Sequence, residues 1–295
     1  MIKTYVEDNI LHAVIDKDLE NDISDIVDLI NLQHVFLAGK EESLHFQFTD
    51  CDFINAAVAV IIGTLPEYAH KHGKRVKYRF SNDEKHPIFK FMQEVGLYKY
   101  YRRKANIKYA GENAIPFNKI ENETIMGEYT DKIMELAPIK MEREAQCILS
   151  SYIYEIYQNG LFHSESEIGV FTSGYWQPER NSFVFSIYDM GVGIPSKIRK
   201  HMNKEDISSE KCLKIAFVEG FSTSENRKVN RGLGLSRIEN FIRLNNGNMK
   251  MFTDDICCIV NAQAPKEYHV LDRAIKGTLI IISILADENH IYKVG

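Results

Sequence analysis

Hydrophobic and polar positions alternate in two short segments in the first third of the chain. Residues 44–48 and 75–80 have the period of two that is typical of half-buried strands. Between them, Asn55 is placed to cap an alanine-rich apolar segment over 55–72, which predicts a helix that ends at a glycine. A shorter helix is predicted over 87–95, beginning at a proline. This order of strand, helix, strand and helix predicts a small α/β layer.

A longer helix is predicted over residues 141–163. Its apolar side chains recur at three- and four-residue spacing and form one inward stripe: Ala145, Ile148, Leu149, Tyr152, Ile153 and Ile156. Glu155, Asn159 and His163 follow one another at intervals of four residues and therefore share one face of the helix. This face begins at one edge of the apolar stripe and then crosses its middle. Polar groups placed there cost about 1–3 kcal/mol each when unpaired, so they need partners. The spacing leaves open a bound ligand, a solvated groove or a polar network between helices.

Two glycine-containing segments lie close to predicted strands. A buried strand over 182–188 is followed at once by Asp189, Gly191 and Gly193, and glycines spaced by two allow a close approach of backbone to a ligand. The aspartate before them offers an acceptor for an exocyclic amine. Another hydrophobic strand is predicted over 277–285. A single glycine pair, taken alone, is more typical of an ordinary turn than of a ligand site.

A second pair of glycines, Gly232 and Gly234, leads directly into an amphipathic helix. The N-terminal N–H groups and the dipole of such a helix form a site for an anion. The spacing matches neither the P-loop nor the dinucleotide-binding fingerprint.

Composition limits the classes of function. The 295 residues carry 41 acidic and 36 basic side chains and a formal net charge of −5, which argues against a dedicated nucleic-acid-binding protein. The number of cysteines is five, and their spacing indicates neither a disulfide framework nor a zinc site. The first residues are charged too early for a signal peptide, and no apolar run approaches the roughly 18 residues of a membrane span. We therefore expect a cytoplasmic protein with no membrane partner.

The four motifs in this order resemble those of the GHKL ATPase superfamily, which includes gyrase B subunits, large heat-shock chaperones, sensor histidine kinases, mismatch-repair ATPases and anti-sigma-factor kinases. The segment 155–163 resembles its N box, 189–195 its first glycine box and 231–235 its second, while Gly277-Thr278 resembles the threonine-bearing motif before the last strand. The resemblance implies an α+β fold in which the C-terminal domain is a two-layer α/β sandwich, the Bergerat ATP-binding fold, with a mixed sheet covered by helices.

The resemblance also implies a ligand, Mg-ATP, and roles for single residues. Asn159 would coordinate Mg²⁺, and Asp189 would accept the adenine amino group with support from Thr278 through water. Gly191 and Gly193 would let the backbone pass under the base and the sugar.

The phosphates would be held by the second glycine box, in particular by Gly232, Gly234 and the N–H groups that follow. Arg231 or Lys228 would meet phosphate charge, although a lysine or arginine in a polar loop is more often simply solvated. Segment 195–231 would be the lid over the nucleotide. The resemblance assigns further nucleotide contacts to Ile194, Leu233 and Leu235.

Glu155 bears on the type of activity. In hydrolysing members and in anti-sigma-factor kinases, a glutamate four residues before the magnesium asparagine acts as general base. The resemblance therefore implies an ATP-driven switch with slow hydrolysis, in which the lid relays the nucleotide state to a partner or to the first domain. Two alternatives stay open: a serine/threonine kinase of the anti-sigma-factor type acting in trans, and a nucleotide-gated binding module without catalysis.

The first half resembles a STAS domain, the fold of anti-sigma-factor antagonists, over the strand at 44–48 and the elements that follow it. Where that family carries a phosphorylated serine, this chain has Asn55, Ala56 and Ala57, so the resemblance implies an interaction module without the phospho-acceptor. Its partner would be a sigma-factor or antagonist type of regulator, or a second copy of the chain.

The expected domain organisation follows from these motifs and from a polar, weakly periodic segment between them. We expect a STAS-like domain over 1–115, a linker over 116–140, the ATP-binding domain over 141–286 and a tail over 287–295.

Overall fold

The structure is a computed structural model, and it describes residues 2–79, 86–102, 113–136, 143–177, 180–221 and 234–285. Within these ranges the chain is mixed α and β with two sheets, in agreement with an α+β class in its coarse form. It divides into two compact units, residues 1–118 with 171–175 and residues 119–170 with 176–295. In the described part of the chain, no helix is both long and apolar enough to cross a bilayer.

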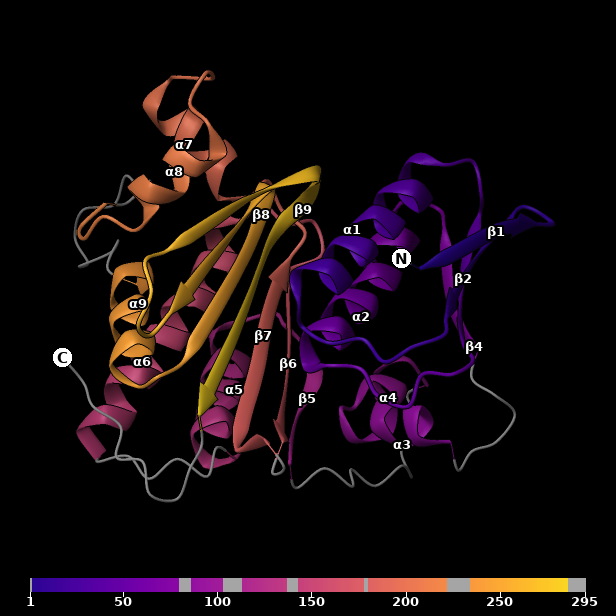
Figure 1. Cartoon of the computed structure of the whole chain (residues 1–295), viewed down its shortest axis with the longest axis horizontal. Helices are drawn as coiled ribbons and strands as arrows, with labels where there is room; N and C mark the ends of the chain where they lie inside the picture. Colours follow the sequence, from indigo (N-terminus) through magenta and orange to yellow (C-terminus); the bar gives the residue numbers. More distant parts are fainter. Residues whose placement is uncertain are drawn as a thin grey trace. The chain divides into compact units, whose positions relative to one another are not determined.

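The first unit contains a four-stranded sheet in the order β1-β2-β3-β4, in which β1 and β2 form an antiparallel hairpin and β2, β3 and β4 are parallel. Its elements are β1 (Lys3–Glu7), β2 (Ile10–Ile15), α1 (Ile23–Ala38), β3 (Ser43–Phe48), α2 (Ala56–Lys71), β4 (Arg75–Arg79), α3 (Pro87–Glu94) and α4 (Leu97–Arg102). Helices α1 and α2 lie along one face of this sheet (Figure 1). The strand–helix–strand–helix order predicted for residues 44–95 is present.

Helix α2 shows why the sequence predicted the elements of this part of the chain correctly. The side chain of Asn55 accepts a hydrogen bond from the N–H of Ala57, as expected for an N-cap. The helix is buried on nearly all sides through its first ten residues, so small alanines alternate with branched side chains along it. Asn55, Ala56 and Ala57 are themselves buried, with no hydroxyl among them.

The remaining elements include a five-stranded sheet in the order β5-β6-β7-β9-β8. They are β5 (Ala114–Ile120), α5 (Glu123–Leu136), α6 (Arg143–Gln158), the π-helix η1 (Asn159–His163), β6 (Val170–Gln177), β7 (Ser182–Asp189), α7 (Ile194–Met202), α8 (Ser209–Ala216), α9 (Gly234–Leu244), β8 (Asn248–Asn261) and β9 (Glu267–Leu285). In the second unit, β9 pairs antiparallel with both β7 and β8. Helices α5, α6 and α9 lie along one face of these strands (Figure 1).

Three stretches differ from the expected elements. Residues 116–140, expected as a linker, hold the end of β5 and helix α5, whose buried residues Met126, Tyr129 and Ile133 recur at helical spacing. The final strand begins at Glu267, ten residues before the apolar run, because its first half continues as a hairpin with β8. The expected tail at 287–295 lies outside the described residues.

Candidate functional site

The second unit encloses a cavity of about 410 Å³ that brings several predicted residues together. Helices α5, α6, α7, α8 and α9, the π-helix η1 and strands β7 and β9 all contribute to its wall. The residues predicted for nucleotide contact that line it are Glu155, Asn159, Asp189, Gly193, Ile194, Leu235 and Thr278. Isoleucine and phenylalanine side chains provide most of the apolar wall, among them Ile156, Ile187, Phe162, Phe221 and Ile280.

One wall is formed by the end of α6 and the π-helix that follows it. The sequence predicts one helix through His163, but the α-helix ends at Gln158 and residues 159–163 form a wider π turn. Such turns often occur at functional sites. A reason for the close packing here is Gly160, since a Cβ at that position would lie 2.7 Å from a methyl group of Val170. Glu155, Asn159 and His163 all line the cavity, Asn159 being exposed.

Asp189 forms the polar end of the cavity, which we call the Asp189 end. Its side chain lies at the end of β7, is 6% exposed and accepts a hydrogen bond of 2.9 Å from the N–H of Gly191. Burial raises the pKa of this carboxyl to about 7, although hydrogen bonds from Gly191, Thr278 and Ser164 and the charge of Lys197 act in the other direction. A buried carboxylate with this pKa is a strong acceptor that is poised near neutral pH.

Glycines surround the Asp189 end because no side chain fits there. A Cβ on Gly191 would lie 2.0 Å from the carbonyl oxygen of Ser164, and one on Gly277 would lie 2.0 Å from the carbonyl oxygen of Asp189. Gly193 and Gly277 also have positive φ angles of 78° and 83°. The segment that contains Gly277 therefore packs against the segment that contains Asp189 and Gly191, with no room for a side chain at either glycine.

The same end holds a pair of threonines. Thr253 of β8 and Thr278 of β9 are opposite each other in the ladder, and their hydroxyl oxygens are 3.1 Å apart. The Thr253 oxygen also accepts a hydrogen bond of 3.0 Å from the N–H of Ile194, the first residue of α7. Thr253 was not identified from the sequence because it lies in no motif and its partners are 25 and 59 residues away.

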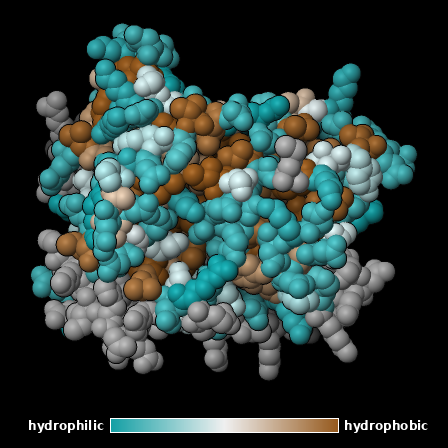
Figure 2. All heavy atoms as spheres, viewed as in Figure 1, coloured by the Kyte–Doolittle hydropathy of each residue, from teal (hydrophilic) through white to brown (hydrophobic). Residues whose placement is uncertain are grey.

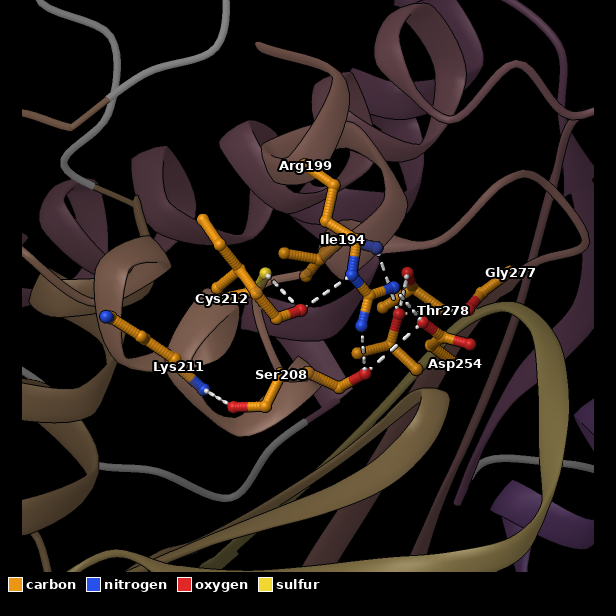
Figure 3. Close-up of polar contacts among 11 residues, drawn as sticks. Ile194, Arg199, Ser208, Lys211, Cys212, Asp254, Gly277 and Thr278 are labelled. Atoms are coloured by element: carbon orange, nitrogen blue, oxygen red, sulfur yellow. Dashed lines mark hydrogen bonds and ion pairs between the residues drawn. The ribbon is translucent and has the colours of Figure 1, made fainter. Parts of the chain in front are cut away.

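Helices α7 and α8 are tied to β8 by Arg199, as Figure 3 shows. Its guanidinium donates to the carbonyl oxygen of Ile207 (2.8 Å), to Asp254 Oδ2 (2.7 Å) and to Ser209 Oγ (2.8 Å). We call these four residues the Arg199 network. The core under the two helices is small, with Ile198, Ile207 and Cys212 at its centre, and the visible outside of this region is mainly hydrophilic (Figure 2). The Arg199 network therefore adds polar contacts between α7, the start of α8 and β8 to this apolar core.

The second glycine box and the basic residues before it form the predicted phosphate site. Residues 222–233, which include Lys228, Arg231, Gly232 and Leu233, lie outside the described residues. Gly234 is the first residue of α9, as expected for the start of the helix after the second glycine box, and Leu235 lines the cavity. The first turn of α9 thus contributes Leu235 to the same cavity that Glu155 and Asn159 line.

The cavity also contains residues that the motifs did not indicate. Lys197 lines it from α7, and burial lowers the pKa of this amine although Glu165 and Asp189 oppose that effect. Glu123 lines it from the start of α5, within the segment for which the sequence predicts a linker. An amphipathic pattern in α5 was the signal that could have located this helix.

The donor groups present fit a magnesium–nucleotide complex. No group of three or more His, Cys, Asp or Glu side chains that could hold a metal occurs in the described ranges. Mg²⁺ in nucleotide sites needs only one or two protein oxygens, because phosphates and water supply the rest. The side-chain oxygen of Asn159, on the cavity wall, meets that requirement.

No known family and no characterised relative emerged from comparisons of this chain with protein families and with curated proteins. The resemblance to GHKL ATPases therefore stays a prediction that rests on the motifs.

Proposed function

We propose that the second unit binds Mg-ATP in the cavity and hydrolyses it slowly as a regulatory switch. The observation that carries this proposal is the meeting of four separate sequence motifs in one cavity, through Glu155, Asp189, Leu235 and Thr278. These residues span 124 positions of the chain, from 155 to 278 counted inclusively, so local structure alone does not bring them together.

The chemistry of the cavity supports an adenine nucleotide. Asp189 is a buried acceptor for an exocyclic amine, and Ile187, Ile194 and Ile280 offer apolar walls for a flat ring. After the second glycine box, the N-terminus of α9 would supply N–H groups and a partial positive charge for phosphates. Asn159 would hold Mg²⁺, which neutralises charge on the phosphates when bound.

Glu155 is the residue in position to act as a base. It lies on the cavity wall four residues before Asn159, the proposed metal ligand, which lines the same cavity. There it would take a proton from an attacking water or hydroxyl, which typically contributes 10²–10⁴-fold to a rate.

The finer fold assignments belong to the same proposal. We propose the Bergerat fold for the second unit, supported by the antiparallel strands β7, β9 and β8 covered on one face by helices. We propose a STAS-like fold for the first unit, supported by the parallel strands β2, β3 and β4 with α1 and α2. The buried Ala56 and Ala57 support a regulatory module without a phospho-acceptor.

The proposal is tested by calorimetry with Mg-ATP and by measuring phosphate release. The purified chain is expected to bind Mg-ATP, and Glu155→Gln is expected to retain binding while phosphate release falls at least about 100-fold. The matched control is Glu128→Gln, which changes an exposed carboxylate on a different helix, α5. It should change neither Mg-ATP binding nor phosphate release. Absence of adenine-nucleotide binding by the wild-type chain would rule out the proposal.

The two alternative activities give different results in the same assay. Transfer of γ-phosphate label to an added STAS-type protein, without release of free phosphate, would indicate a kinase acting in trans. Tight binding without turnover, and with no effect of Glu155→Gln, would indicate a nucleotide-gated binding module.

A further inference from the structure

Thr253 is fully buried beside the Asp189 end and is absent from the described residues that line the cavity. It makes three polar contacts through one oxygen atom. These join it to the carbonyl oxygen of Gly277 at 3.1 Å, to the hydroxyl of Thr278 at 3.1 Å and to the N–H of Ile194 at 3.0 Å. Any effect of Thr253 on a ligand must therefore act through one of these neighbours.

A count of protons shows which way each of these hydrogen bonds runs. A hydroxyl has one proton to donate and two lone pairs to accept with. The Ile194 N–H is only a donor and the Gly277 carbonyl is only an acceptor, so Thr253 accepts from the first and donates to the second. One lone pair is left, and the contact with Thr278 is satisfied only if Thr278 donates to it.

This arrangement determines what Thr278 presents to the cavity. Its single proton is directed to Thr253, so the part of its hydroxyl that faces the cavity carries only lone pairs. The ionised carboxylate of Asp189, at the same end, also presents only acceptors. The amino group on a ring edge can donate hydrogen bonds to these acceptors at the Asp189 end. A carbonyl oxygen in the same place is itself an acceptor, so the acceptors face each other and stay unpaired.

We infer that Thr253 is a positioning residue that sets the specificity of the cavity for a 6-aminopurine over a 6-oxopurine, by holding the Thr278 hydroxyl as an acceptor. This inference rests on the proposed function. It adds a residue outside all the motifs and ties selection of the base to the first residue of α7.

The test compares binding of Mg-ATP and Mg-ITP, which differ at position 6 of the purine, at pH 8 by calorimetry. Thr253→Val removes the hydroxyl at nearly constant volume and releases the Thr278 proton to point into the cavity. We expect the ratio of ATP affinity to ITP affinity to fall at least about tenfold. Thr253→Ser keeps the hydroxyl and is expected to keep the ratio within about threefold of the wild-type value.

A purely structural role gives a different result. If Thr253→Val weakens both nucleotides by the same factor, or leaves the ratio unchanged, the inference is wrong even though the proposed function stands. Failure of the wild-type chain to bind either nucleotide would instead reject the proposed function.

A second variant keeps the test decisive where Thr253→Val does not fold. Thr278→Val removes the hydroxyl through which Thr253 acts, so the same fall in the ATP/ITP ratio is expected. A Thr278→Val protein that still discriminates between the two nucleotides as well as the wild type overturns the inference.

Discussion

Each of the two units contains a buried aspartate, and the two are held in different ways. Asp25 in the first unit, 2% exposed, accepts hydrogen bonds from Lys17 Nζ at 2.5 Å and from the N–H of Glu20 at 2.8 Å. Asp189 in the second unit, 6% exposed, is hydrogen-bonded to backbone N–H groups and to the Ser164 hydroxyl, and Lys197 acts on it only as a nearby charge.

The difference separates a structural carboxylate from a candidate ligand-binding one. Asp25 lies in the first turn of α1 with an ammonium group directly on it, so its charge is neutralised within the fold. Among the residues that the structure describes, no cationic side chain bonds directly to Asp189, which lines a cavity, so its charge is left for something that enters. Burial raises the pKa of Asp189, and the nearby charge of Lys197 offsets that effect only in part.

The largest expected effect comes from filling the glycine packing around Asp189. Gly277→Ala places a Cβ 2.0 Å from the Asp189 carbonyl at a φ of 83°, and we expect it to lower the free energy of unfolding by more than about 4 kcal/mol. Gly73→Ala in the first unit is the matched control, because its φ is 72° and nothing lies within 4 Å of the added Cβ. That control should cost only about 1–2 kcal/mol, from backbone strain. Similar losses in the two variants, measured by urea unfolding, would contradict the close packing.

Neutralising the two aspartates should change stability in opposite directions at pH 8. Asp25→Asn leaves Lys17 without its counter-charge and is expected to destabilise by about 2 kcal/mol, since Lys17 is itself half-exposed. Asp189→Asn removes a carboxylate whose burial is unfavourable when it is ionised and is expected to stabilise by up to about 4 kcal/mol. The same variant is expected to weaken ATP binding, because the amide adds a donor where an acceptor is needed.

The pH dependence of the Asp189 effect follows from its raised pKa. A carboxyl whose pKa is about 7 in the folded chain, against an ordinary value of 3.8, stabilises the fold fully below about pH 4, and this contribution is lost as pH rises toward 7. The advantage of Asp189→Asn over the wild type should therefore be largest above pH 7 and vanish near pH 4. Unfolding curves at pH 4, 6 and 8 check this, and an advantage independent of pH would contradict it.

The smallest expected effect comes from weakening the Arg199 network, which connects α7 and α8 to β8 in the second unit. Arg199→Lys keeps the charge but cannot make the three contacts of the Arg199 network, so we expect a loss of about 1–2 kcal/mol and faster amide exchange in α7 and α8. Lys214→Ala removes an exposed ion pair with Glu210 on α8 and should cost less than about 0.5 kcal/mol. Hydrogen exchange by mass spectrometry distinguishes the two, and equal exchange in both variants would assign the network no special role.

Local signals in the sequence predicted the elements and motifs whose causes are themselves local. The cap at Asn55, the strand that ends at Asp189 and the helix that begins at Gly234 each depend on a few neighbouring residues. Thr253 could not be found in this way, because its role arises from contacts with Ile194 and Thr278 across the sheet.

Two further differences also have physical causes. The π turn at 159–163 brings Gly160 against Val170, a long-range contact that helical periodicity does not encode. Helix α5 was missed because its exposed face is strongly polar, which hid the buried positions between.

The ladder between β8 and β9 shifts register on both sides of Asp254, which has a φ of 53°. Consecutive side chains of a regular strand point to opposite faces, yet Thr253 and Asp254 both bond to α7, one at Ile194 and the other at Arg199. Residue 254 thus determines which side chains of the following hairpin point to each face of the sheet. Insertions and deletions therefore have very different effects along this hairpin. Residues added at its tip, around 262–266, would only lengthen a turn. One residue deleted at 254 would exchange the inward and outward faces from Ile256 onward.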